Sequence, residues 1–151
     1  MTIYREKLWA SAWVFLSMAL VIPASLLVFW PISVTAGILV ALVLYAGCCG
    51  MLVLASPVIG VADGVFTAGR ARLPLEFAGE ATAYREPEAT LQRGRLLDAR
   101  AWLLLRGWVT PVVRIDVTDP QDPTPYWLVS TREPERLADA INAARPPSAS
   151  S

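Results

Sequence analysis

The chain has 151 residues, of which 55% are hydrophobic and 17% charged, and its formal net charge is zero. Soluble domains carry about 45–50% apolar and about 25% charged residues, so this composition excludes a largely disordered chain. The charge balance speaks against nucleic-acid binding, which needs a basic surface. Histidine is absent from the sequence, which excludes Ser-His-Asp and Cys-His catalysis and every zinc site that uses histidine.

An uncharged stretch from residue 8 to residue 62 dominates the first part of the chain. A membrane span needs about 20 apolar residues, and only helices satisfy their own backbone inside lipid. Pro31 interrupts the stretch because proline disfavours helix before it. The sequence therefore predicts a transmembrane helical hairpin over residues 9–56, with a first span from about Trp9 to Phe29 and a second from about Val34 to Ala55.

Basic residues near the span ends predict the orientation of this hairpin. Arg5 and Lys7 precede the first span, Arg70 and Arg72 follow the second, and the turn between the spans has no charge. Because basic flanks stay in the cytoplasm, we expect a multi-pass inner-membrane protein with both termini cytoplasmic. Residues 1–8 then form a cytoplasmic N-terminal segment. A cleaved signal peptide is the alternative, but its apolar run is usually shorter, and here a second span follows at once.

Small residues recur four apart in the second span, which lets helix backbones approach closely. The pairs are Gly37 with Ala41 and Ala46 with Gly50. They pack either against the first span of this chain or against another membrane protein. Pro23 is expected to kink the first span, a feature that membrane helices tolerate.

Residues 57–145 hold most of the charge and many turn signals, and they predict a cytoplasmic, β-rich domain. Asp63-Gly64 between two short apolar runs is a strong hairpin signal. Further strands are expected over residues 71–73, 80–84, 112–117 and 126–130. Residues 87–92 are either a loop or a helical turn. Within residues 98–106 a short helix and a buried strand remain alternatives.

The last predicted element is an amphipathic helix. Ser130 or Thr131 is its expected cap, and Ser130 with Glu133 has the spacing of a capping box. One apolar stripe at helical spacing follows, made of Leu137, Ile141 and Ala144. Residues 146–151 are expected to be a disordered tail. The fold class is thus a membrane α-helical hairpin followed by a small α+β domain, either an antiparallel sheet or a barrel that resembles the pleckstrin-homology fold, with a C-terminal helix.

Three motifs resemble a named family. They are Tyr4–Trp9, Ala68–Pro74 and Asp119–Arg132. On these residues the chain resembles an uncharacterised actinobacterial family of two-span membrane proteins, domain of unknown function 3093. The resemblance implies an inner-membrane protein and transfers no activity.

Asp119 and Asp122 are the first candidate site residues. They stand three apart in a proline-rich turn, where two carboxylates could help to bind a hard cation. Aspartate also starts turns by accepting hydrogen bonds from its own backbone, and no further oxygen ligands are evident nearby. The sequence favours the turn.

Tyr126, Trp127 and Arg132 form a possible interaction surface. Neighbouring strand residues face opposite ways, so one ring is expected in the core and the other exposed. An exposed tryptophan beside Arg132 would suit a lipid headgroup or a partner peptide. A second candidate is an anion-binding face, against ordinary surface ion pairs. Its arginines are Arg70, Arg72, Arg93, Arg95, Arg100 and Arg106.

These patterns indicate no catalytic, cofactor-binding or metal-binding residue. We expect a non-enzymatic, membrane-anchored interaction or scaffold module, or an accessory subunit. Its partners would be the lipid bilayer and another membrane protein or complex, with no nucleic acid and no small-molecule substrate. The alternative function is a module of pleckstrin-homology type that senses lipid headgroups.

Overall fold

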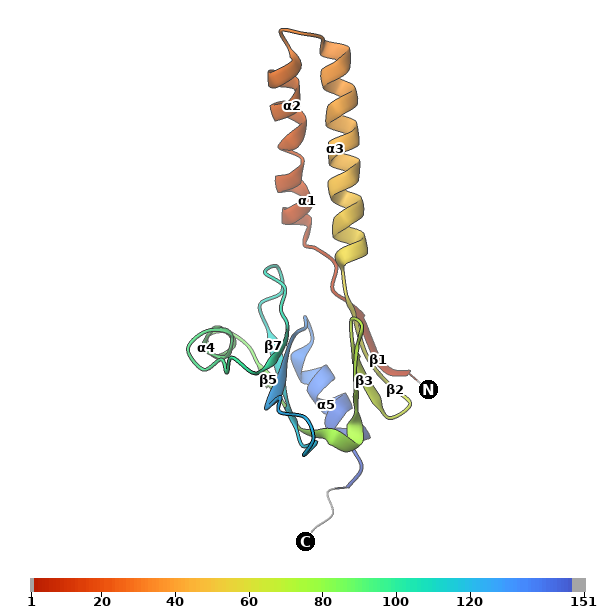
Figure 1. Cartoon of the computed structure of the whole chain (residues 1–151), viewed down its shortest axis with the longest axis vertical. Coiled ribbons are helices and arrows are strands. Elements are labelled where there is room, and N and C mark those ends of the chain that lie inside the picture. Colours follow the sequence, from red (N-terminus) through yellow and green to blue (C-terminus); the bar gives the residue numbers. More distant parts are fainter. Residues whose placement is uncertain (1, 148–151) are drawn as a thin grey trace. The chain divides into compact units, whose positions relative to one another are not determined.

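The computed structural model describes residues 2–147, which divide into two compact units. One unit is the helical stretch Trp9–Ser56, and the other combines the chain up to Leu8 with the chain from Pro57 on. Figure 1 shows both units along the chain. Residues 2–8 therefore fold with the C-terminal part of the chain, although the sequence pattern set residues 1–8 apart as a separate segment.

The helical unit contains α1 (Ala12–Met18), α2 (Val21–Phe29) and α3 (Val34–Ala55). The helix α3 begins and ends at the predicted residues of the second span. Ser33 caps it, because its hydroxyl oxygen accepts a hydrogen bond from the Ala36 N–H at 3.3 Å. The first apolar stretch, Ala12–Phe29, has a mean hydropathy of 2.3 and α3 one of 2.6, so each is long and apolar enough to cross a membrane.

Pro23 explains why the first apolar stretch is two helices rather than one. Proline has no N–H to donate to the carbonyl four residues before it, which here is that of Ala19. The Ala19 carbonyl accepts instead from the Ile22 N–H at 3.1 Å, a tighter turn than the α-helix has. The helix is interrupted at Ala19 and Leu20, one turn before the proline.

The two small-residue pairs of α3 have different surroundings. Gly37 and Ala41 are buried, and a Cβ on Gly37 would lie 3.3 Å from the Cβ of Phe29 in α2. This pair therefore packs inside the hairpin. Ala46 and Gly50 are exposed, and a Cβ on Gly50 would meet no atom within 4 Å.

Replacing Gly37 by leucine is expected to destabilise the hairpin by about 1–3 kcal/mol, because the added side chain overpacks the contact with α2. The matched control is Gly50→Leu, whose new side chain enters open space. The measurement is the fraction of sodium dodecyl sulfate that half-unfolds each variant in mixed micelles. Equal midpoints for the two variants would contradict the packing described here.

The first sheet is antiparallel and has the strand order β1-β2-β3-β4. Its strands are β1 (Thr2–Lys7), β2 (Val58–Ala62), β3 (Val65–Ala68) and β4 (Ala71–Pro74). Asp63 and Gly64 join β2 to β3 with positive φ angles of 52° and 73°. These angles fit the tight hairpin turn predicted for Asp-Gly, which is therefore confirmed.

The second sheet has the order β5-β7-β8-β6 and mixes strand directions. Its strands are β5 (Ala78–Tyr84), β6 (Trp102–Leu104), β7 (Val112–Val117) and β8 (Tyr126–Ser130). The strand β6 pairs with β8 in parallel, which decides the open question over residues 98–106 in favour of a strand. A short 3-10 turn, η1 (Leu75–Phe77), separates β4 from β5. The two sheets stay separate, so residues 2–147 form no closed barrel, and the expected likeness to the pleckstrin-homology barrel is limited to strands followed by a helix.

Both faces of the second sheet are covered. The helix α5 (Pro134–Ala144) lies between the two sheets (Figure 1), and its fully buried Leu137 and Ile141 share one core with residues of both sheets. On the opposite face, Ala89 of α4 (Glu88–Arg93) packs on Val112 and Leu128. The second sheet therefore lies between α5 and α4, which explains why all five residues of β8 are buried.

The predicted capping box of the last helix is wrong. Ser130 belongs to β8, and its hydroxyl oxygen accepts a hydrogen bond from the Arg106 N–H at 3.0 Å. The helix begins at Pro134, with Glu133 at the cap position and no side-chain hydrogen bond there. Proline fits this first position because its missing N–H would have no partner inside the helix. Of the predicted tail, residues 148–151 lie outside the described residues.

Candidate functional site

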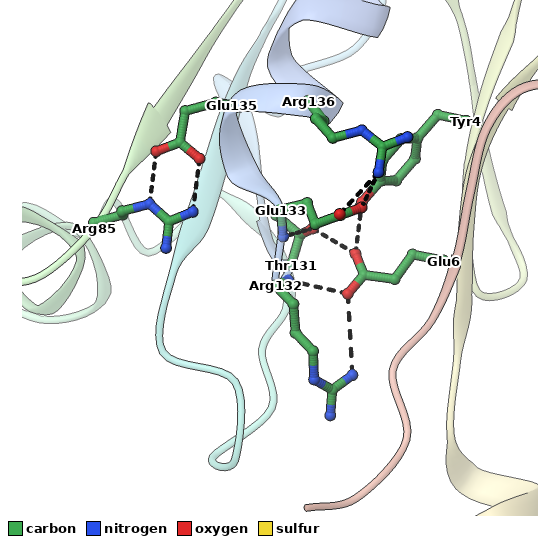
Figure 2. A network of polar contacts seen from close by, with 8 residues as sticks. All are labelled: Tyr4, Glu6, Arg85, Thr131, Arg132, Glu133, Glu135 and Arg136. Atoms are coloured by element: carbon green, nitrogen blue, oxygen red, sulfur yellow. Dashed lines mark hydrogen bonds and ion pairs between the residues drawn. The ribbon is translucent and has the colours of Figure 1, made fainter.

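Glu6 is the centre of a polar cluster that joins β1 to the start of α5, shown in Figure 2. The alternation of β1 directs Tyr4 and Glu6 to the inner face of the first sheet, opposite Val61 and Ile59 of β2. Thr131 and Arg132 directly follow β8, one of the two inner strands of the second sheet. We call Tyr4, Glu6, Thr131 and Arg132 the Glu6 cluster.

The carboxylate of Glu6 accepts hydrogen bonds from three different groups. The Tyr4 hydroxyl donates to Oε2 at 2.8 Å, and the Thr131 hydroxyl donates to the same oxygen. The Arg132 N–H donates to Oε1 at 3.0 Å. The Glu6 side chain is only 12% exposed, and the Arg132 guanidinium lies 4.0 Å from Oε1. The Glu6 carboxylate is thus nearly buried, and directed donors on both of its oxygens offset the cost of removing it from water.

Tyr4 is held in its protonated, donating form. Burial raises the pKa of the Tyr4 hydroxyl well above its ordinary value, and the hydrogen bond to Glu6 adds to the rise. The tyrosine therefore stays a hydrogen-bond donor throughout the physiological range. Arg136 lies over its ring, 6.0 Å from the centroid, and pairs with Glu133 at 2.8 Å.

The Glu6 cluster has a structural role: it holds β1 against the segment between β8 and α5. The donors occupy both carboxylate oxygens, and the Thr131 oxygen also accepts from the Glu133 N–H at 3.2 Å. The cluster ties residues 125 and 126 positions apart in the chain. A second tie is made by Arg85, directly after β5, which donates two hydrogen bonds to Glu135 at 2.6 and 2.8 Å. The pair is exposed, and the hydrogen bonds that Arg85 donates lower the pKa of Glu135.

Asp119 and Asp122 each form the turn that the sequence favours. The Asp119 carboxylate accepts from the Gln121 N–H and the Asp122 carboxylate from the Thr124 N–H, both at 2.9 Å. The hydrogen bonds from Thr124 lower the pKa of Asp122. They therefore stabilise the turn at pH values above the ordinary pKa of aspartate, and this stabilisation is lost as the pH falls and the carboxylate is protonated. Among residues 2–147, His, Cys, Asp and Glu form no group that could hold a metal ion.

The prediction that one ring of Tyr126 and Trp127 is exposed is wrong. Tyr126 is 3% exposed and Trp127 6%, because both faces of β8 are covered. The Tyr126 hydroxyl accepts from the Asp98 N–H at 2.8 Å, on the side of α4. Trp127 packs against Trp102 at 4.3 Å and Phe66 at 6.0 Å between ring centroids. Arg132 is exposed, but its neighbour is Glu6 and not an exposed tryptophan.

The six arginines proposed as an anion-binding face fall into two groups. Arg70 and Arg72 belong to the hairpin of β3 and β4, whereas Arg93 ends α4 and the other three lie between α4 and β7. In that second group Arg100 pairs with Asp98 at 3.2 Å, as the ion-pair alternative expects. Arg93 donates to the carbonyls of Thr110 and Arg106.

Residues 3–141 match a protein family described as protein of unknown function, DUF3093. The chain belongs to this family. The match covers all three motifs, the whole helical unit and most of the other unit, and it confirms the DUF3093 resemblance. No curated protein and no solved structure matches the chain.

Two motifs of this DUF3093 protein meet in the Glu6 cluster. Tyr4 and Glu6 come from the first motif, and Thr131 and Arg132 close the third. Sequence reasoning named only Arg132 of these four as a site residue. A charged residue in an extended segment before a span was the only signal for Glu6, and it gives no indication of a partner beyond the hairpin.

Proposed function

We propose that the two apolar helices cross the inner membrane and anchor the β-rich unit at its cytoplasmic face as a non-enzymatic interaction module. The observation that carries the proposal is the pairing of β1 with β2. These strands flank the helical hairpin on its two sides in the sequence. A ladder between them requires that the chain enters and leaves the bilayer on the same side.

Burial supports a membrane environment for the helices. In the apolar 18-residue part of each helical stretch, only 6% is buried within the fold. The core helix of a soluble protein hides its apolar side chains, whereas these helices expose large ones such as Leu27, Leu42 and Met51. A lipid environment removes this mismatch.

The strand β1 also argues against a cleaved leader. Cleavage after the first apolar stretch would remove Tyr4 and Leu8, which are 5% and 0% exposed in the domain core. It would also leave Thr131 without Glu6. The cytoplasmic side is the side that Arg5, Lys7, Arg70 and Arg72 favour.

Anchoring is the proposed mechanism. Two spans keep the domain at the membrane surface and raise its effective concentration toward a neighbouring membrane protein or complex. The non-enzymatic role is supported by the carboxylates of the Glu6 cluster and of the 119–122 turn, which are engaged by the fold's own donors. An actinobacterial inner membrane is the location that the resemblance implies.

Thiol labelling tests the orientation. In a background with Cys48→Ser and Cys49→Ser, the variants Ile32→Cys in the exposed turn between the spans and Gln121→Cys in the domain are treated with a membrane-impermeant maleimide. Intact cells should label only the Ile32→Cys protein, and both should react after permeabilisation. Labelling of Gln121→Cys alone in intact cells would reverse the orientation. Equal labelling of the two variants in intact cells, or release of the protein from membranes by alkaline carbonate, would overturn the anchoring.

A further inference from the structure

The solvent-facing side of the first sheet carries a row of residues with an unusual composition. Strand register places Arg5, Gly60, Thr67 and Arg72 side by side across β1, β2, β3 and β4. Their neighbours along each strand point into the core, so this row points outward. One guanidinium group therefore stands at each end of a row whose middle is small.

The middle of the row is hollowed. A hollow of about 280 Å³ is lined by residues that include Thr2, Arg5, Gly60, Thr67 and Gly69. Gly60 is one of the lining residues, and a Cβ there would lie 2.9 Å from the Tyr4 carbonyl oxygen. The close approach of β1 and β2 thus requires glycine, and the lack of a side chain leaves room beside the Arg5 guanidinium and the Thr67 hydroxyl.

The charges of this face are of one sign. Arg5, Arg70 and Arg72 are exposed and make no ion pair within residues 2–147, and Lys7 follows on the same face of β1. Of the acidic residues in the four strands and the turns between them, Glu6 faces the core and Asp63 lies in the β2–β3 turn. We call Arg5, Lys7, Arg70 and Arg72 the basic face.

Outside the first sheet, four arginines have close acidic partners, whereas Arg95 makes no ion pair within residues 2–147. Acidic partners hold Arg85, Arg100, Arg114 and Arg136 in ion pairs of 2.6 to 3.2 Å. The balanced net charge of the chain therefore hides a local excess on the first sheet. Such an excess attracts anions, and paired arginine side chains suit phosphate because they donate several hydrogen bonds in a fixed geometry.

We propose that the basic face binds the phosphate of anionic phospholipid headgroups, with the hollow between Arg5 and Thr67 as the phosphate site. This inference rests on the proposed membrane anchoring. Only residues 8–11 lie between β1 and α1, and only residues 56–57 between α3 and β2. An extended chain covers at most about 3.3–3.6 Å per residue, so an inserted hairpin keeps these strands within reach of the headgroup layer whatever the orientation of the domain.

The test uses the full chain in nanodiscs of phosphatidylcholine, with and without roughly one third phosphatidylglycerol, and measures amide hydrogen exchange in β3 and β4. The wild type should exchange more slowly in the anionic discs, and salt near 0.5 M should remove the difference. The variant Arg5→Gln/Arg72→Gln should lose the protection, since two arginines together correspond to about a 30-fold change in affinity for an anionic surface. The control Arg95→Gln/Arg100→Gln removes the same charge from exposed positions outside the first sheet and should behave as the wild type.

Each other outcome has a definite meaning. Equal exchange in both kinds of disc, or equal loss of protection in both double variants, would overturn the proposal. Protection by glycerol phosphate alone in neutral discs would assign the hollow to a soluble phosphate ester and would also overturn the lipid assignment. Failure of the anchoring itself would appear separately, as wild-type protein that does not incorporate into either disc.

Discussion

Trp127→Ala is expected to lower the free energy of unfolding of the β-rich unit by about 3–5 kcal/mol. The ring is 6% exposed and packs against Trp102 and Phe66, so alanine leaves a cavity where the two sheets share a core. Pulse proteolysis of the full chain in a mild detergent gives the urea midpoint of the unit. That midpoint should fall by about 1–5 M.

The same variant separates the core role of Trp127 from the recognition role that the sequence suggested. A recognition residue could be replaced with little change in stability and with loss of a bound partner. Leu96→Ala is the control, because Leu96 is 56% exposed in the same unit and should leave the midpoint nearly unchanged. If Trp127→Ala and Leu96→Ala gave the same midpoint, the burial of Trp127 would not describe the protein in solution.

The parts of the fold that the sequence predicted depend on local chemistry. Proline at the turn and an uncharged run set the bounds of α3, Asp63-Gly64 set the hairpin of β2 and β3, and the apolar stripe set the face of α5. Each of these signals acts within a few residues of the element it specifies. Such signals remain readable without knowledge of the tertiary structure.

The parts that were missed depend on distant partners. The strand β1 has the sequence TIYREK, which lacks an apolar alternation, and it becomes a strand because β2 pairs with it beyond the hairpin. Likewise, Trp102–Leu104 becomes a strand because β8 lies beside it in parallel. The burial of both rings in β8 had a signal, since the unbroken run Tyr126–Val129 is typical of a strand covered on both faces. The prediction of one exposed ring instead treats β8 as a half-exposed strand.

Glu6→Ala is expected to cost about 2–4 kcal/mol, because it leaves the Tyr4 and Thr131 hydroxyls and the Arg132 N–H without their acceptor in a largely buried place. The matched control is Glu135→Ala, which also removes one carboxylate that pairs with an arginine. The Arg85–Glu135 pair is more than half exposed on both sides, so solvent already screens it and its loss should change the urea midpoint little.

A double-mutant cycle decides whether the Glu6 cluster acts as a unit. Thr131→Val removes the hydroxyl that donates to Glu6, so adding it to Glu6→Ala should cost much less than Thr131→Val does alone. Strictly additive losses of unfolding free energy would show that the two residues act independently and would contradict the structural role of the Glu6 cluster. A coupled result would show that the Glu6 carboxylate holds β1, the strand that leads into the first helix, to the loop before α5. Loosening that bond should expose β1 to protease before the rest of the unit unfolds.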